Sequence, residues 1–344
     1  MAKGIGSWLF CEQKSKLPPA LHADLSGRTV VVLGANTGIG FETTQHLARM
    51  SPGRLIIGCR SETKGRDAAA KIQAKTGVKP ELRLVDLGTF ASVKAFSDGL
   101  KNVPIDILVI NAGVMQMSYQ TTANGWEENL QINHLSAALV AFLLLPNMVK
   151  AAEDHHNLSR VVFVGTGLHY MVDLKDVQSS PRIIEALSDR QYSESKPSVM
   201  ANRYSITKLI NLLFVRALAE HLPYNLPVLP IVVSPGYCVS DLRRHSSVGE
   251  RVGLKVLDLI VGRTAEEGSR MLVFAAVGPD GKDGGHARAM RGGYLATLEI
   301  REPSDFVVSK EGHDAQEKIW VETIGVLRQV IPEVGEIVGT YMDK

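Results

Sequence analysis

Short apolar, β-branched runs alternate with longer segments of helical periodicity along the chain from Thr29 onward. Such alternation is typical of βαβ units and predicts a parallel sheet with helices on its faces. The runs are almost continuously apolar, as expected for strands that are buried on both sides. Seven strands are predicted, over Thr29–Leu33, Arg54–Gly58, Glu81–Val85, Asp106–Ile110, Arg160–Val164, Val228–Val233 and Gly293–Ala296. The chain is therefore predicted to be an α/β protein with one doubly wound, seven-stranded parallel sheet.

Apolar residues recur every three or four positions near Gly125–Lys150 and Tyr204–Leu222, which predicts two long helices. Two other stretches, Leu168–Arg203 and Tyr237–Gly262, break the alternation just after predicted strands. Because ligands of open α/β sheets bind outside the carboxyl ends of the strands, these stretches are predicted to shape a substrate pocket. We expect an N-terminal arm over residues 1–25 and one domain over residues 26–344, with pocket insertions at 168–203 and 237–262.

Composition excludes several classes of protein. Hydrophobic residues make up 45% of the 344 positions and charged residues 22%, which is ordinary for a globular chain. The 38 basic and 36 acidic residues leave a net charge of +2, too small to indicate a nucleic-acid partner. The three cysteines are far apart and match no metal-ligand spacing, which predicts neither a metal site nor disulfides. No stretch has the roughly 20 apolar residues of a transmembrane segment, so a soluble, cytoplasmic protein is predicted.

A glycine-rich turn follows the first predicted strand and opens a helix, with the sequence Gly-Ala-Asn-Thr-Gly-Ile-Gly over residues 34–40. Glycines let the backbone approach a pyrophosphate, and a helix N-terminus presents unpaired N–H groups and a positive dipole end. The turn therefore predicts an anion site, although its spacing differs from GxGxxG and such a turn can also serve geometry alone. Its cofactor-binding candidates are Gly34, Asn36, Thr37, Gly38, Ile39 and Gly40.

The end of the second predicted strand bears on the choice of cofactor. An acidic residue there would accept hydrogen bonds from the NAD ribose, whereas an arginine accommodates the 2′-phosphate of NADP. The sequence has Arg60 and then Lys64, which favours NADP(H), and the alternative is a solvated arginine without a ligand. After the third strand, Asp86 and Leu87 are candidates for holding the adenine, and Asp86 is alternatively a helix N-cap.

Tyr204 and Lys208 stand four residues apart in a predicted helix, on one helix face. A neighbouring ammonium favours the tyrosinate form and lowers the pKa of a tyrosine, which would let Tyr204 exchange a proton with a substrate oxygen. By itself the pair is weak evidence, because both residue types are common on helix surfaces.

Taken together, the motifs resemble those of the short-chain dehydrogenase/reductase family over nearly the whole chain, from about Ser26 to the C-terminus. The retinol-dehydrogenase-like and fungal secondary-metabolism members are the most similar. The motifs that carry the resemblance are residues 34–40, Asp86-Leu87, Asn111-Ala112-Gly113-Val114, Asn133, Tyr204 with Lys208, and Ser234-Pro235-Gly236. The resemblance implies a Rossmann-type fold and an NADP(H)-dependent oxidoreductase without a metal.

The resemblance also implies roles for residues of the fourth strand and the helix after it. Asn111, Ala112 and Gly113 would end that strand beside the cofactor, where small side chains permit close approach. Asn133 would bind a water through the helix backbone and, with Lys208, complete a proton relay to solvent. Lys208 would also hold the nicotinamide ribose.

Pro235 and Gly236 would cover the nicotinamide together with Val239, and Ser240 stands where a threonine often bonds the carboxamide. One position departs from the family pattern: Thr166 takes the place of the usual catalytic serine after the fifth strand. Its hydroxyl can donate the same hydrogen bond to a carbonyl oxygen, but its branched side chain is stiffer and crowds the pocket.

These expectations lead to one main functional hypothesis, an NADPH-dependent reductase of a ketone or aldehyde, or the reverse alcohol dehydrogenase, in secondary metabolism. Tyr204 would be the general acid or base. Thr166 motivates the alternative of a redox-neutral dehydratase, isomerase or cyclase, and a non-catalytic nucleotide sensor is a third reading. The nearby His169 and Tyr170 are expected either to contact substrate or to serve the loop alone.

The two pocket insertions favour a medium-sized, apolar substrate, because they contain several large apolar side chains. These are Leu168, Tyr170, Met171, Met200, Tyr237, Val248 and Leu254. The family resemblance implies a homodimer formed through the two long helices, but the elaborated relatives are often monomers, so monomer and homodimer both stay open.

Overall fold

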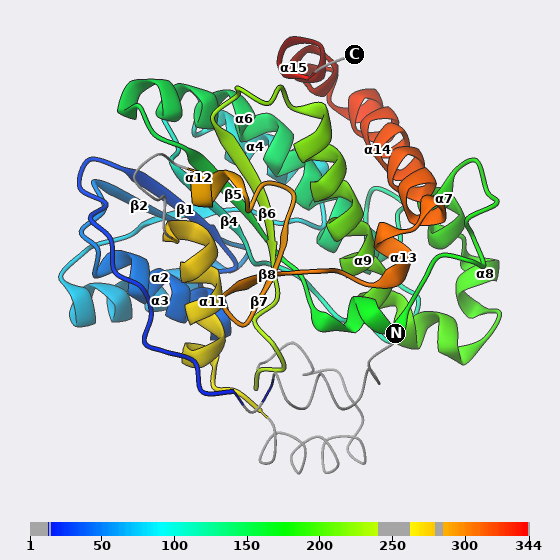
Figure 1. Cartoon of the computed structure of the whole chain (residues 1–344), viewed down its shortest axis with the longest axis horizontal. Helices are drawn as coiled ribbons and strands as arrows, with labels where there is room; N and C mark the ends of the chain where they lie inside the picture. Colours follow the sequence, from blue (N-terminus) through cyan, green and yellow to red (C-terminus); the bar gives the residue numbers. More distant parts are fainter. Residues whose placement is uncertain (1–12, 14, 240–261, 279–284, 343–344) are drawn as a thin grey trace.

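A computed structural model describes residues 13, 15–239, 262–278 and 285–342. Its centre is one sheet of eight strands in the order β3-β2-β1-β4-β5-β6-β7-β8 (Figure 1). The strands are β1 (Thr29–Leu33), β2 (Arg54–Cys59), β3 (Glu81–Leu84), β4 (Ile107–Ile110), β5 (Ser159–Val164), β6 (Val228–Val233), β7 (Tyr294–Ala296) and β8 (Glu299–Arg301). All neighbours from β3 to β7 pair in parallel. The predicted doubly wound α/β fold is thus confirmed.

The sheet has one strand more than the sequence predicted. The additional strand, β8, is antiparallel to β7 and makes a hairpin with it. The two connecting residues, Thr297 and Leu298, both have positive φ angles, 51° and 61°. Two-residue hairpins of this kind usually carry Asn-Gly or Asp-Gly, because branched and large residues are strained at positive φ. The Thr-Leu pair therefore gave no turn signal, and the short strand was missed.

Helices cover both faces of the sheet (Figure 1). One face carries α2 (Gly38–Ala48), α3 (Glu62–Thr76) and α11 (Ala265–Val277). The other carries α4 (Phe90–Asp98), α6 (Ser136–His155), α9 (Pro197–His221), α14 (Lys310–Val330) and α15 (Glu333–Tyr341). Alternate residues of the inner strands enter opposite cores: Val31 packs into the second layer, and Val30 and Val32 into the first. This is why the inner strands are apolar at nearly every position. The expectation of burial on both sides is wrong for β3, which lies at the edge of the sheet and leaves Leu84 49% exposed.

The predicted helix at Gly125–Lys150 is a continuous helical stretch from Glu128 to His155. It comprises a short first turn, α5 (Glu128–Leu130), a π-helical turn, η1 (Gln131–Leu135), and then α6. In length and apolarity it would suffice to cross a membrane, but 89% of its most apolar stretch is buried inside the protein. Within the described residues it is the only such helix, and its burial is what a core helix beneath a sheet requires.

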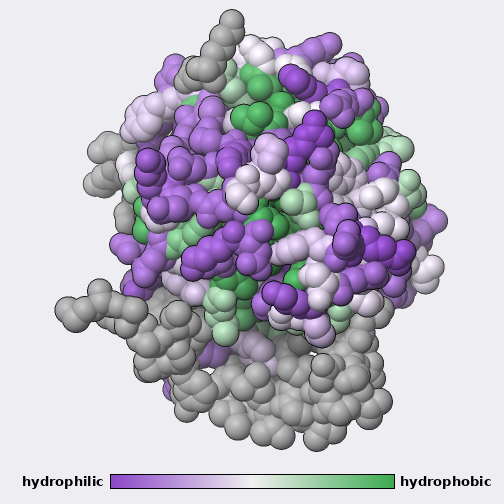
Figure 2. Space-filling model, turned by 90° about the vertical axis from the view of Figure 1, so that its right-hand side faces the viewer, coloured by the Kyte–Doolittle hydropathy of each residue, from purple (hydrophilic) through white to green (hydrophobic). Residues whose placement is uncertain are grey.

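The C-terminal helices cover the two long helices through which a homodimer was expected. α14 packs along α9, and α15 packs against α6. The ring of Trp320 on α14 lies 5.6 Å from that of Phe214 on α9 and 5.7 Å from that of Phe142 on α6. The face beyond α14 is mainly hydrophilic, with hydrophobic residues only in small separate areas (Figure 2). The long helices are thus packed against other helices of the same chain.

The segment from residue 168 to 203 is less irregular than predicted. It contains a 3₁₀ turn, η2 (Gly167–Met171), and two short helices, α7 (Ile183–Ser188) and α8 (Arg190–Glu194). Its last residues already belong to α9, which begins at Pro197, a residue suited to the first turn of a helix. Most of the second predicted insertion, residues 240–261, lies outside the described residues. The remaining short helices are α12 (Gly285–Arg288) and α13 (Asp305–Val308).

Candidate active site

The glycine-rich turn lies where the strand order reverses, between the carboxyl ends of β1 and β4. Asn111 joins the two ends, its Nδ2 donating a hydrogen bond to the carbonyl oxygen of Gly34 at 3.0 Å. A Cβ atom on Gly34 would lie 2.8 Å from the Cα of Ala112, and one on Gly40 would lie 2.3 Å from the Gly34 oxygen. Only glycine allows these two approaches. Ala112 is thereby brought against the turn, and its expected place beside the cofactor stays a prediction.

Gly38 has a different environment from the other two glycines of the turn. Its φ angle is +58°, and a Cβ atom there would meet no atom within 4 Å. Gly38 is also the first residue of α2, whose first turn contains no acidic residue. An open backbone with unpaired N–H groups at a helix start fits the pyrophosphate of a dinucleotide, with Asn36, Thr37 and Ile39 in the same turn.

Arg60 and Lys64 are both exposed next to the carboxyl end of β2. Neither takes part in an ion pair within the part of the chain that the structure describes. Ser61 caps α3 by accepting a hydrogen bond from the Lys64 backbone N–H, so both basic residues stand at a helix start. Positive side chains beside a helix N-terminus form a setting that suits a phosphate group.

Asp86 follows β3, and the structure excludes one of its two predicted roles, that of the helix N-cap. The N-cap of α4 is Thr89, whose side chain accepts a hydrogen bond from the Ser92 backbone N–H. The Oδ1 atom of Asp86 accepts from the Gly88 N–H at 2.9 Å and closes a tight turn instead. Asp86 is therefore not the cap of that helix, and the adenine role stays a prediction. Leu87 beside it is buried.

Tyr204 and Lys208 lie on one face of α9, as predicted, with the Lys208 Nζ 5.8 Å from the centre of the Tyr204 ring. Lys208 is 4% exposed. Its ammonium donates a hydrogen bond of 2.7 Å to the backbone oxygen of Val164, the last residue of β5. Burial lowers the pKa of Lys208 from 10.5 to about 8, because a desolvated ammonium loses its hydration.

Asn133 stands within the π-helical turn, which points its side chain at the loop after β4. Its Oδ1 accepts from the backbone N–H of Val114 at 2.8 Å, and its Nδ2 donates to the Val114 oxygen at 2.9 Å. A Cβ atom on Gly113 would lie 3.0 Å from the Asn133 Oδ1 and 3.6 Å from the Lys208 Nζ. The structure therefore brings Gly113, Asn133 and Lys208 together, and the absence of a side chain at Gly113 makes this approach possible.

Asn211 is a site neighbour that the sequence analysis missed. Its Nδ2 donates a hydrogen bond of 2.7 Å to the backbone oxygen of Asn133. The sequence analysis expected this carbonyl oxygen of Asn133 to bind the water of the proton relay. Such a water would therefore share the oxygen with the Asn211 side-chain amide. Asn211 is buried, and its Oδ1 pairs with the ring of His134 at 3.0 Å. Its position one helical turn after Lys208, on the same side of α9, was the signal available in the sequence.

Thr166 follows β5 and caps the η2 turn. Its Oγ1 accepts a hydrogen bond from the Leu168 N–H at 3.3 Å, a role that leaves the hydroxyl proton available for donation. Its backbone oxygen accepts from the Nδ1 of His169 at 2.7 Å. His169 is 1% exposed, and its Nε2 accepts from the Ser304 N–H at 3.2 Å. Of the two roles expected for His169, the structure favours the loop role, because the ring is buried and both of its nitrogens bond the backbone.

Tyr170 is also tied to the structure. Its hydroxyl donates to the backbone oxygen of Glu302, and its ring lies 4.1 Å from that of His169. Burial lowers the pKa of His169 to about 4, so its ring is neutral at pH 7. The neutral form with the proton on Nδ1 matches both of its hydrogen bonds, because a carbonyl only accepts and an N–H only donates.

The segment after β6 approaches the glycine-rich turn from the side of α11. A Cβ atom on Gly268 of α11 would meet the side chains of Cys238, Pro235 and Ile39 at 2.4, 3.4 and 3.6 Å. Pro235 therefore stands near the start of α2, and its expected role in covering the nicotinamide stays a prediction. Val239 is 47% exposed. Ser240 lies outside the described residues.

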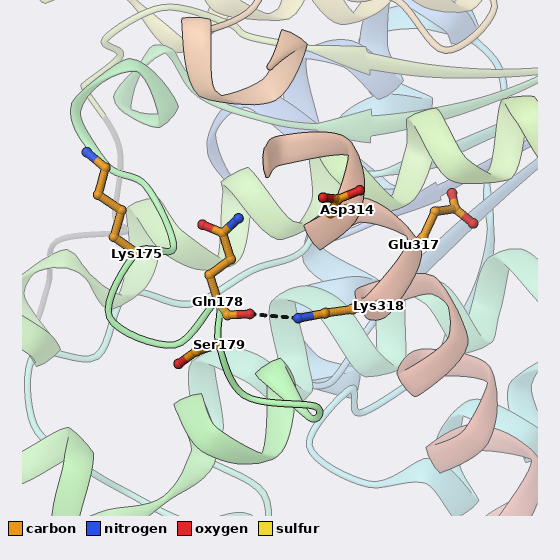
Figure 3. A pocket seen from close by; sticks show the side chains of 6 residues that line it. All are labelled: Lys175, Gln178, Ser179, Asp314, Glu317 and Lys318. Atoms are coloured by element: carbon orange, nitrogen blue, oxygen red, sulfur yellow. Dashed lines mark hydrogen bonds between the residues drawn. The ribbon is translucent and has the colours of Figure 1, made fainter. Parts of the chain in front are cut away.

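Two hollows in the described part of the chain lie away from Tyr204. The larger, of about 640 Å³, lies between the loop before α7 and helix α14 (Figure 3). Its lining residues carry both signs of charge: Lys175, Gln178, Ser179, Asp314, Glu317 and Lys318. The smaller, of about 210 Å³, includes Asn202 and Ile206 of α9, which lie on the opposite side of that helix from Tyr204.

Comparison with known proteins identifies the family. A family model described as short chain dehydrogenase matches residues 28–171. The short-chain dehydrogenase anuD of Penicillium roqueforti is 32% identical over 96% of this chain and 84% of its own length. The short-chain dehydrogenase/reductase ffsI of Aspergillus flavipes is 31% identical over 94% of this chain and 93% of its own. The chain belongs to the short-chain dehydrogenase/reductase family of oxidoreductases.

Solved structures support the same fold. An uncharacterised protein from Mycobacterium paratuberculosis covers 96% of this chain and 98% of its own, with a TM-score of 0.61 and 25% identity. The L-sorbose reductase of Gluconobacter frateurii, solved with NADPH and L-sorbose, covers 81% of this chain and 99% of its own, with a TM-score of 0.56 and 18% identity. The second likeness is one of fold alone.

Proposed function

We propose that the protein is an NADPH-dependent reductase of a ketone or aldehyde, or the corresponding alcohol dehydrogenase, with Tyr204 as the general acid or base. The observation that carries the proposal is the convergence of Tyr204, Lys208 and Asn133 at the carboxyl ends of β4 and β5. These strand ends lie next to the point between β1 and β4 where the strand order reverses, and ligands of such sheets bind there.

NADP(H) would bind along the carboxyl edge of the sheet and supply the hydride. The open backbone at Gly38 would receive the pyrophosphate, and Arg60 with Lys64 would pair with the 2′-phosphate. Asp86 and Leu87 would hold the adenine, and Pro235, Gly236, Val239 and Ser240 would cover the nicotinamide.

The proton chemistry would fall to the residues of α9. Lys208 holds a positive charge next to Tyr204, which favours the tyrosinate and makes its hydroxyl a better acid towards a carbonyl oxygen. The Thr166 hydroxyl would polarise the same carbonyl, since its Oγ1 accepts only from the Leu168 N–H within this turn. Asn133 would keep the loop at Gly113 and Val114 in place beneath the cofactor.

A medium-sized apolar metabolite is the proposed substrate. Several of the large apolar side chains that stay exposed in the described residues follow the carboxyl ends of three adjacent strands. They are Met117 after β4, Leu168 and Met171 after β5, and Val239 after β6. Exposed apolar side chains that follow the carboxyl ends of neighbouring strands, where ligands of such sheets bind, favour an apolar ligand. We place the reaction in cytoplasmic secondary metabolism, in line with the fungal relatives.

The test is a spectrophotometric assay of the purified protein with NADPH and a panel of apolar ketones and aldehydes. A fall in absorbance at 340 nm that depends on the carbonyl compound is expected, with NADH a poorer donor. Because Thr166 replaces the usual serine, a redox-neutral reaction is the second candidate. Product formed from a panel substrate while the absorbance stays constant would favour that candidate over the reductase.

A further inference from the structure

The N-terminal residue Gln13 contacts the segment that follows β6. Its Nε2 donates a hydrogen bond of 2.7 Å to the backbone oxygen of Tyr237, and its Oε1 accepts from the Tyr237 N–H at 2.9 Å. The Gln13 side-chain amide thus bonds both the N–H and the carbonyl oxygen of Tyr237, the two groups that a neighbouring strand would bond. The two residues are 224 positions apart in the sequence, so only the fold brings them together.

Arg263, just before α11, bonds the same segment. Its backbone N–H donates to the oxygen of Tyr237 at 2.9 Å, and its oxygen accepts from the Val239 N–H at 3.0 Å. Its guanidinium reaches the oxygen of Pro235 at 3.5 Å and the Oγ of Ser15 at 3.3 Å. The segment from Pro235 to Val239 is therefore held between the N-terminal residues and Arg263.

Gly236 fits tightly inside this arrangement. Its φ angle is +79°, a conformation that favours glycine. A Cβ atom there would also lie 2.8 Å from the Oε1 of Gln13 and 2.7 Å from the Nη1 of Arg263. Any larger residue would have to push the two side chains away.

The N-terminal residues are themselves bonded to α11, which packs against α2 on one face of the sheet. Arg270 of α11 donates to the backbone oxygens of Leu17 and Pro18 at 3.0 and 3.2 Å. Glu266 pairs with Arg270 at 2.6 Å and with His46 of α2 at 3.0 Å. In Figure 1 the N-terminal segment, in blue, runs past α11, in yellow. Gln13 therefore extends from an anchored stretch of chain.

We propose that Gln13 is a positioning residue for the nicotinamide half of the cofactor. The inference rests on the proposed function, in which Pro235 to Val239 cover the nicotinamide. The adenine half would lie at β2 and β3, and four strand spacings of about 4.8 Å, or about 19 Å, separate β2 from β6. Loss of the Gln13 contacts therefore weakens binding of the nicotinamide half and leaves the adenine half unchanged.

The experiment compares two ligands by isothermal titration calorimetry on the full-length protein. One is NADP⁺, and the other is 2′-phospho-ADP-ribose, which has the same adenine half and pyrophosphate but no nicotinamide. In Gln13→Leu the Kd for NADP⁺ is expected to rise about tenfold, the effect of losing two hydrogen bonds of about 0.7 kcal/mol each. The Kd for 2′-phospho-ADP-ribose is expected to stay the same.

Two further variants make the result specific. Lys16→Ala changes an exposed residue of the same stretch and is expected to bind both ligands like the wild type. Gly236→Ala, whose added Cβ atom would push against the Gln13 amide beside Tyr237, is expected to reproduce the selective loss. Equal NADP⁺ affinity in Gln13→Leu and wild type, or an equal loss for both ligands, would overturn the inference. A wild type that binds neither ligand would instead overturn the proposed function.

Discussion

The ammonium nitrogen of Lys208 lies 2.7 Å from the backbone oxygen of Val164 at the carboxyl end of β5. This contact ties the face of α9 that carries Tyr204 to the strand that Thr166 follows. Thr166 comes only two residues after Val164, so the proposed proton donor and the proposed carbonyl-polarising group are held on one rigid unit. A positive charge is thereby buried beside Tyr204, which costs stability and would serve the proposed proton transfer.

Removal of the Tyr204 hydroxyl should stop turnover without loss of the cofactor. A positioned general acid commonly contributes about 10² to 10⁴ in rate, so Tyr204→Phe should lower kcat by that factor. Its Kd for NADPH should stay within about twofold of wild type, because the ring and the fold are kept. Stopped-flow single-turnover assays and calorimetry would measure the two quantities. Unchanged turnover in this variant would contradict the assignment of Tyr204.

The buried charge of Lys208 predicts a pH dependence of stability. Its pKa is about 8 in the folded protein and near 10.5 in the unfolded chain, so between these values the unfolded chain binds the additional proton. The free energy of unfolding contributed by this group therefore rises with pH across that window, by about 3 kcal/mol at most. Lys208→Met has no ammonium that titrates at this position. Its free energy of unfolding, relative to that of the wild type, should therefore fall as the pH rises from 8 to 10. Urea denaturation at several pH values would measure this, and a pH-independent difference would contradict it.

Arg60 should determine the preference between the two nicotinamide cofactors. Arg60→Ala removes a charge-assisted contact with the 2′-phosphate, so the Kd for NADPH should rise by about 10- to 100-fold. The Kd for NADH, which lacks this phosphate, should change little. Arg66→Ala is the matched control, because Arg66 is an exposed arginine of α3, the helix that follows Arg60, and pairs with Glu62. Equal effects of Arg60→Ala on both cofactors would argue against NADP selection at this position.

His169 should stabilise the protein in a manner that depends on pH. His169→Phe keeps a ring but leaves the Thr166 oxygen and the Ser304 N–H unpaired, which should cost about 1 to 3 kcal/mol at pH 7. The pKa of His169 is about 4 when folded and near 6.5 when unfolded. The free energy of unfolding of the wild type therefore falls as the pH falls from 6.5 to 4. The difference in this free energy between wild type and His169→Phe should become smaller over the same range.

Urea denaturation between pH 4.5 and 7.5 would measure this difference in the free energy of unfolding. His22→Phe, at an exposed histidine, should behave like the wild type at every pH. A gap between wild type and His169→Phe that widens on acidification would show that His169 is not held neutral.

The covering of α6 and α9 by α14 and α15 predicts a monomer. Light scattering after size-exclusion chromatography should give the mass of one chain. Val321, which is 67% exposed on the outer side of α14, provides a check, since Val321→Glu should leave the mass unchanged. A dimer in the wild type that this substitution dissociates would contradict the prediction and would identify α14 as the interface.

The sequence by itself determined the sheet and most of the expected site residues. Continuous apolar runs such as Thr29–Leu33 have few alternatives to a doubly buried strand, and the glycines at 34, 38 and 40 mark the turn that only they can form. The Tyr204 and Lys208 pair was readable because helical spacing brings residues four apart together. These features are local in sequence, so local physical chemistry suffices to predict them.

Tertiary structure alone decided the contacts between distant segments. Nothing near His169 in the sequence indicated Ser304, and nothing near Gln13 indicated Tyr237, because each pair meets only after the sheet has formed. The β7–β8 hairpin escaped prediction because Thr297 and Leu298 adopt positive φ angles that their own preferences disfavour, so the surrounding fold must impose them. The sequence thus indicated the candidate groups of the site, and long-range packing decided which side chains, such as those of His169 and Gln13, hold the backbone of distant segments.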